Sequence, residues 1–117
     1  MSTVTKVIIQ NTLVASTATA EFTAASNEQT FIGKVLFTNT STSDVSVTFY
    51  NLQSTETATS GSGGNWSWIG TIPAQKTVVV DELIGTIVAS NGNITLSAGT
   101  ANVILANIFG ASEAITT

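Results

Sequence analysis

The side chains of this chain that could do chemistry are hydroxyls and amides, because the sequence contains no His, no Cys and no Arg. General acid–base catalysis near neutral pH, thiolate chemistry and bidentate phosphate recognition each depend on one of these missing residue types. Ser and Thr are plentiful as nucleophiles, but the base would have to be one of three Lys or a carboxylate, and none of these stands in a catalytic motif. We therefore expect no enzymatic activity and no catalytic residues.

The acidic residues and glycines also lack the spacing of a ligand site. Asp81 and Glu82 form the only acidic doublet, and adjacent residues on a strand point to opposite faces, which prevents them from working as an acid–base pair. Gly61-Ser62-Gly63-Gly64 has no Lys and no following helix, so a phosphate loop is excluded. The remaining acids are too scattered for a Ca²⁺ site, and we expect neither a metal nor a cofactor.

The net charge of the chain argues against nucleic acid and anionic lipid as binding partners. Three Lys against seven acids give a net charge of −4, so the chain has no basic surface for nucleic acid or for anionic lipid. No apolar run approaches the roughly 18 residues of a membrane span. Polar residues interrupt the N-terminal apolar stretch too early for a signal peptide, and we expect the N-terminus to be the first strand of the mature protein.

Two indoles are the most distinctive large side chains. Trp66 and Trp68 are spaced at i and i+2, which places both on one face of a strand. Such a pair could belong to the core, to a protein interface, where Trp is enriched, or to a carbohydrate platform of stacked rings. These three alternatives stay open at this level.

A Gly/Ser-rich segment precedes the indoles. Residues 53–65 contain no large apolar residue before Trp66, and their composition predicts a flexible loop that is long for a compact domain. The loop is either a neutral insertion or an arm that orders against a neighbour. The candidate interface residues are Trp66, Trp68, Tyr50, Ser60, Gly61 and Gly63.

Alternating apolar and polar residues recur along the chain, with turn residues between the alternating segments. Residues 30–38 and 45–50 are predicted to form one hairpin, and Asn91-Gly92 a second. Gly85 and the β-branched residues after it allow no more than one helical turn after Asp81. The predicted strands are 4–14, bent near Gln10-Asn11, then 21–24, 30–38, 45–50, 66–72, 77–80, 84–89, 93–96 and 102–109.

These elements predict an all-β fold. We expect residues 1–117 to form a single domain, an antiparallel β-sandwich or jelly roll of about eight short strands. The absence of alternating strand and helix patterns argues against βαβ units.

The pattern of the strands resembles that of small structural proteins of tailed-bacteriophage virions. The resemblance covers most of the chain and rests on these segments: 21–24, Thr30-Phe31-Ile32-Gly33-Lys34-Val35-Leu36-Phe37-Thr38-Asn39-Thr40, 45–50, Ile72-Pro73-Ala74, 78–80, 93–98 and 103–110. It implies a virion component and does not distinguish head decoration proteins from neck, tail or fibre components.

The composition favours assembly as well. Only 9% of the residues are charged, against about a quarter in typical domains, so faces and edges left uncovered would tend to associate. We expect a capsid decoration (cement) protein on the virion surface, trimeric, that binds and stabilises the major capsid protein lattice or binds another virion protein. The alternatives are a neck, tail or fibre component, a carbohydrate-binding module and, more remotely, an enzyme.

Overall fold

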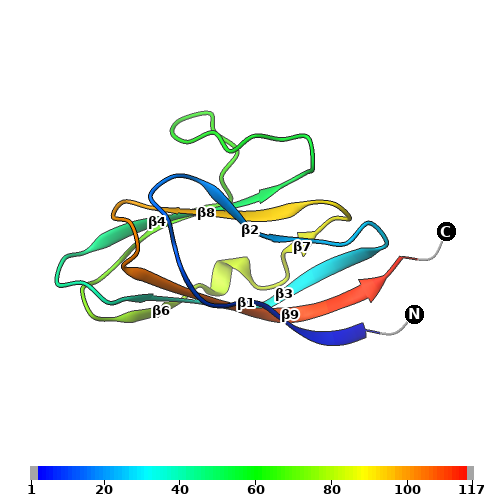
Figure 1. Cartoon of the computed structure of the whole chain (residues 1–117), viewed down its shortest axis with the longest axis horizontal. Helices are drawn as coiled ribbons and strands as arrows, with labels where there is room; N and C mark the ends of the chain where they lie inside the picture. The colour runs from blue at the N-terminus through cyan, green and yellow to red at the C-terminus, as the bar shows by residue number, and fades with distance from the viewer. Residues whose placement is uncertain (1–2, 116–117) are drawn as a thin grey trace.

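The computed structural model describes residues 3–115, which form two β-sheets packed face to face (Figure 1). Sheet A has the strand order β1-β9-β3-β6, with β7 also paired to β3, and sheet B has the order β2-β8-β4-β5. The prediction of an all-β antiparallel sandwich is confirmed. The strands of sheet A are β1 (Thr3–Leu13), β3 (Glu28–Asn39), β6 (Thr77–Val79), β7 (Ile87–Val88) and β9 (Ile104–Ala114), and those of sheet B are β2 (Thr19–Thr23), β4 (Val45–Leu52), β5 (Trp68–Ile72) and β8 (Asn93–Ala98).

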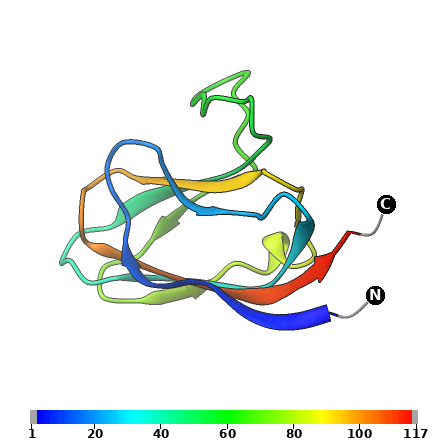
Figure 2. The same ribbon diagram turned by 45° about the vertical axis from the view of Figure 1, so that its right-hand side comes forward.

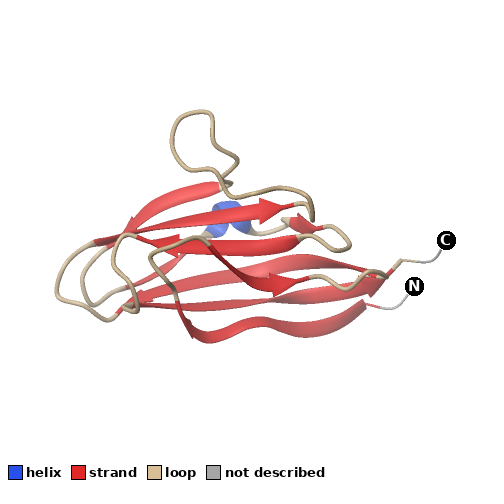
Figure 3. Cartoon of the chain, turned by 45° about the horizontal axis from the view of Figure 1, so that its top comes forward, coloured by secondary structure: helices blue, strands red, loops and turns tan. Residues whose placement is uncertain are grey.

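The sandwich is elongated, with principal extents of 48 × 29 × 21 Å. The loop between β4 and β5 stands out from sheet B, and the start of β1 and the end of β9 lie at one end of the molecule (Figure 2). Between the layers lies a single 3-10 turn, η1 (Asp81–Leu83), drawn in blue in Figure 3. Its length agrees with the single helical turn that the sequence allows.

The core forms where the alternating apolar residues of the two sheets meet. On β3 the buried apolar positions are Ile32, Val35 and Phe37, and on β4 they include Val47 and Phe49. Burial of such side chains is worth roughly 1.5–3 kcal/mol each, and it fixes the register, because a slip of one residue would expose every one of them.

The predicted bend in the first strand is confirmed. The register of β1 against β9 shifts between Val7 and Ile9 and again between Ile9 and Thr12. Asn11 lies within the second shift and has φ 45, a left-handed conformation that Asn tolerates better than most residues. The two irregularities let β1 curve along the edge of the sandwich.

The two predicted hairpins are wrong, although both turns exist. β3 and β4 belong to different sheets, and so do β7 and β8. Asn91 has φ 62, and the N–H of Gly92 donates to the carbonyl of Ala89 at 2.8 Å, so the Asn-Gly turn is tight. A turn sequence specifies that the chain reverses, but it does not specify the strand with which the next segment pairs.

Several predicted strand ends also change. The strand predicted from Trp66 begins at Trp68, and the one predicted over residues 84–89 shortens to Ile87–Val88. β9 continues to Ala114, five residues beyond the predicted end at Phe109, because β1 and β3 supply partners on both sides. Pairing partners that are distant in sequence therefore set these lengths.

Asn39 holds the crossing from sheet A to sheet B. Its side chain is fully buried at the end of β3, and Nδ2 donates to the carbonyls of Ser43 at 2.7 Å and Ile72 at 2.9 Å. Oδ1 accepts from the backbone N–H of Ser41 at 2.9 Å and from its hydroxyl at 2.8 Å. Since Ile72 ends β5, this one amide joins the ends of strands in both layers.

We expect Asn39→Ala to lower the free energy of unfolding by about 2–3 kcal/mol, because the Ile72 carbonyl and the Ser41 N–H lose their partners inside the protein. Urea unfolding followed by circular dichroism measures the change. The matched control is Asn27→Ala at an exposed Asn, for which we expect a change within about 0.5 kcal/mol. Equal effects of the two substitutions would contradict the role given to Asn39.

Candidate functional site

The loop between β4 and β5, residues 53–67, is held by its own hydrogen bonds. The backbone N–H of Gln53 donates to Oε1 of Glu56 at 2.7 Å, and the N–H of Glu56 donates back to the Gln53 carbonyl at 3.0 Å. Asn65 bridges the loop, since Oδ1 accepts from the N–H of Thr59 at 2.8 Å and Nδ2 donates to the Thr57 carbonyl at 2.9 Å. The loop thus has more internal structure than the flexible chain that its Gly/Ser content predicts.

Glycine is required where the loop closes on itself. A Cβ on Gly64 would lie 2.2 Å from the carbonyl oxygen of Thr59, too close for any side chain. The N–H of Gly64 donates to the carbonyl of Gly61 at 3.0 Å, and Gly61 and Gly63 both have φ 80. These glycines are therefore part of a defined turn, because L-residues rarely adopt that conformation.

Trp66 is the large side chain that this turn presents to solvent. Its indole Nε1–H donates to the carbonyl of Gly61 at 2.9 Å, and 40% of the residue is exposed. Three other predicted interface residues, Ser60, Gly61 and Gly63, lie in the same loop. The hydrogen bond orients the ring against the loop while its apolar edge stays accessible.

Trp68 has a different environment, so the two indoles do not share a face. Trp68 starts β5, and its ring stacks on Phe37 of sheet A with centroids 5.9 Å apart and an interplanar angle of 18°. The ring also covers Gly70, where a Cβ would lie 2.3 Å from the indole. Trp68 thereby closes the β5 edge of the sandwich, and Trp66, which precedes the strand, remains outside.

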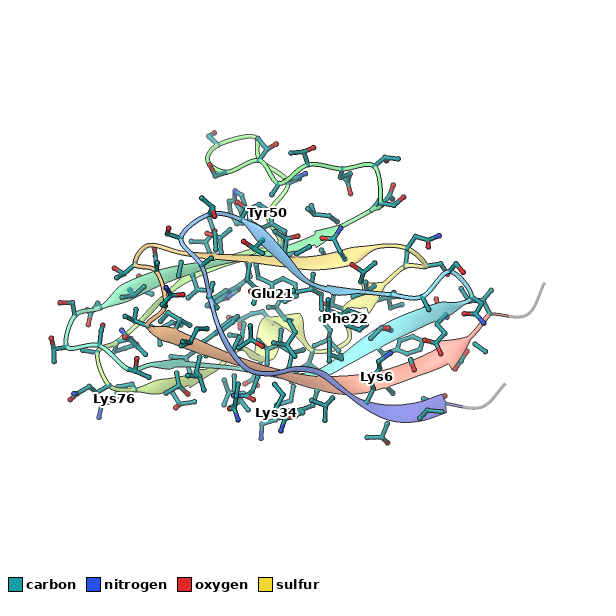
Figure 4. All side chains as sticks on the ribbon, viewed as in Figure 1. Lys6, Glu21, Phe22, Lys34, Tyr50 and Lys76 are labelled. Carbon is teal, nitrogen blue, oxygen red and sulfur yellow. The ribbon has the colours of Figure 1, made fainter. Side chains whose placement is uncertain are left out.

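Tyr50 lies beneath the loop and not at the surface of the single chain. It is 2% exposed on β4, at a position that alternates with the core residues Val47 and Phe49, so it points to the outer side of sheet B. Figure 4 labels Tyr50 at the base of the loop. Of the predicted interface residues, Tyr50 therefore lies under the loop, Trp68 packs against the core, and Trp66, Ser60, Gly61 and Gly63 belong to the loop itself.

The outer side of sheet A is a second candidate surface, which the sequence analysis did not single out. We call it the sheet A face. Across it run four cross-strand pairs of apolar side chains: Leu13–Leu105, Val7–Phe109, Leu36–Val79 and Phe31–Ile87. All eight alternate with inward-facing residues, and all are exposed or half-buried. The signal in the sequence was the run Val35-Leu36-Phe37, which is apolar on both sides of its strand.

The ionisable groups of the described residues form no compact site. Nζ of Lys6 lies 3.8 Å from a Glu28 carboxylate oxygen and 5.2 Å from the centre of the Phe22 ring. Within residues 3–115 no group of three or more potential metal ligands comes together, and no pocket opens in the surface. In the same part of the chain no helix has the length and apolar character to cross a bilayer.

No protein-family model, no curated protein and no solved structure matches the chain. The two surfaces described above, the loop that carries Trp66 and the sheet A face, are therefore the features from which a function has to be argued.

We expect Trp68→Ala to lower the free energy of unfolding by about 2–3 kcal/mol, because it removes the contact with Phe37 and uncovers the β5 edge. Trp66→Ala is the matched control, with a smaller expected loss of about 1 kcal/mol, since Trp66 is not packed against the core and its ring donates one hydrogen bond within the loop. Urea unfolding followed by circular dichroism measures both variants. A larger loss for Trp66→Ala would contradict this assignment of the two indoles.

Proposed function

We propose that the chain is a non-enzymatic structural protein of a tailed-phage virion, a capsid decoration protein that binds and stabilises the major capsid protein lattice. The observation that carries this proposal is the apolar character of the surface. Among residues 3–115, the exposed large apolar side chains are Val4, Val7, Leu13, Trp66, Ile69, Val79, Ile84, Ile87 and Ile115. A chain with 9% charged residues has few charges with which to separate them. Such surfaces mark places where another protein binds.

The loop of residues 53–67 supports a contact with a larger protein partner. It projects from sheet B (Figure 1), and its indole is oriented by the hydrogen bond to Gly61. Trp is among the residues most enriched in the energetic centres of interfaces. Internal hydrogen bonds fix the loop before binding, which lowers the entropy lost when it docks.

We name the major capsid protein as the partner because the strand pattern resembles that of small tailed-phage virion proteins. A neck, tail or fibre component would use the same kind of surface, so the position in the particle has to be measured. The carbohydrate-binding alternative loses its main support, because the platform of two indoles on one face is not formed.

We expect particles of the virus whose genome encodes this chain to contain it at a fixed ratio to the major capsid protein, because a decoration protein repeats with the lattice. Quantitative mass spectrometry of gradient-purified particles, and of heads separated from tails, measures this ratio. Recovery with tails alone would assign the chain to the neck, tail or fibre. Absence from the particles would contradict the proposal.

We expect Trp66→Ser to weaken binding to particles that lack the chain by about 30-fold, the effect of losing an aromatic side chain worth about 2 kcal/mol at an interface. Co-sedimentation of the labelled chain with the particles measures the affinity. The control is Val4→Ser, which removes an exposed apolar side chain from β1 in the other sheet and should leave binding unchanged. Unchanged binding by the Trp66 variant would make the loop a neutral insertion.

A further inference from the structure

One step of the turn between β7 and β8 is prone to spontaneous chemical change. Asn91 is the only Asn in the sequence that is followed by Gly. A backbone nitrogen can attack the side-chain amide of the preceding Asn, and it does so most readily in Gly, which has no Cβ to obstruct the approach. Asn91 is also exposed, so water and base reach the amide group that reacts.

The reaction converts the amide to an acid with water as its only co-reactant. The Gly92 nitrogen loses its proton to a base in solution and bonds to Cγ of Asn91, and the Cγ–Nδ2 bond breaks with release of ammonia. Water then opens the resulting cyclic imide at one of its two carbonyl carbons. Opening at Cγ gives Asp, and opening at the backbone carbonyl gives an isoaspartyl residue, in which the main chain runs through Cγ. No group is oxidised or reduced.

In the folded chain, three backbone hydrogen bonds oppose this attack. Gly92 is buried, and its N–H donates to the carbonyl of Ala89 at 2.8 Å. The N–H of Asn91 donates to the carbonyl of Ala24 at 3.1 Å, and the N–H of Ala24 donates to the carbonyl of Gly92 at 2.9 Å. The attacking nitrogen is thus bonded and shielded from base, so the reaction requires the turn to open.

The bonds to Ala24 tie the turn to an outer strand. β2 is the outermost strand of sheet B and pairs with β8, where Thr23 opposes Asn93. Ala24 follows directly, so its two bonds to the turn extend this pairing. β2 has only five residues and a register shift, and its one large apolar side chain, Phe22, packs against the core. A short, irregular outer strand of this kind separates more often than the whole sandwich unfolds.

We propose that Asn91 is a site of spontaneous deamidation, and that separation of β2 from the turn sets its rate. While the turn is closed, the Gly92 nitrogen is hydrogen-bonded and does not react. The isoaspartyl product has one more main-chain carbon, so residue 91 and Gly92 no longer match the two backbone groups of Ala24. Modification therefore prevents the turn from pairing with the end of β2 again. This chemistry belongs to the chain itself and does not depend on the proposed virion role.

The first test compares the folded chain with the chain unfolded in guanidinium chloride, at the same mildly alkaline pH. Peptide mass spectrometry locates each amide that has become an acid, and enzymatic methylation counts isoaspartyl groups. We expect Asn91 to react on the order of 100-fold more slowly in the folded chain, because only open molecules react. Asn102 is the internal control, since it is exposed and has the same φ of 62 but precedes Val103. Equal rates in the folded and unfolded chains, or at both Asn residues of the unfolded chain, would overturn the proposal.

Two variants distinguish opening at β2 from unfolding of the whole chain. Phe22→Ala removes the side chain that anchors β2 and should accelerate modification of the folded chain by about tenfold or more. Trp68→Ala is the matched control, because it removes an aromatic side chain at the opposite edge of sheet B, and we expect a much smaller acceleration. Circular dichroism checks that both variants are folded. Equal acceleration would assign the reaction to global unfolding and contradict the role of β2.

Two further measurements do not depend on these variants. Hydrogen exchange of the Gly92 amide in the wild-type chain reports the same opening, and we expect it to be faster than exchange of the Phe49 amide on the central strand β4. Exchange as slow as that of Phe49 would contradict local opening. Asn91→Gly keeps a residue that adopts φ 62 readily but removes the reactive amide, so the isoaspartyl product of the unfolded chain should disappear. Its persistence would place the modification elsewhere.

Discussion

The fold depends on the insertion of β9 between β1 and β3. β9 pairs along most of its length with both neighbours, so the last strand of the described chain connects the first strand to the third. Without it β1 would have no sheet partner, and β3 would keep only the short strands β6 and β7. These pairings join residues between 65 and 110 positions apart, so sheet A gains its stability only when most of the chain has folded.

The same strand arrangement determines which side chains lie on the outer sides of the two sheets. Because β9 and β3 lie side by side at the centre of sheet A, their outward apolar residues Phe109, Leu105, Leu36 and Phe31 share one side of the sheet, where each is paired across the strands with Lys34, Thr38, Asn107 or Ala111. Sheet B differs because the loop of residues 53–67 rises from its outer side, where Tyr50 is buried. The two layers therefore present different surfaces: sheet A has a broad face on which apolar and polar side chains alternate, and sheet B has a projecting loop.

Because the chain has few charged residues, its side-chain amides and hydroxyls provide most of the specific polar contacts. Asn39 fixes the crossing between the sheets, and Asn65 fixes the projecting loop. Asn11 and Asn107 bond to one another across β1 and β9, where the Asn11 backbone turns left-handed. Hydrogen bonds of this kind are insensitive to salt and depend on geometry, and they keep the local shape of a turn even where the surface around it is apolar.

The sequence by itself determined the fold class, the approximate strands, the bend in β1 and the single helical turn, because alternation and turn chemistry are local properties. It also located the loop and the Trp residues that follow it, but not which of the two indoles is exposed. Only the tertiary structure decided which strands pair, since the turns at residues 40–44 and at Asn91-Gly92 allow either a hairpin or a crossing between sheets. It likewise separated Trp66 from Trp68, placed Tyr50 under the loop and assembled the sheet A face. Each of these outcomes depends on partners distant in sequence, and no local pattern specifies them.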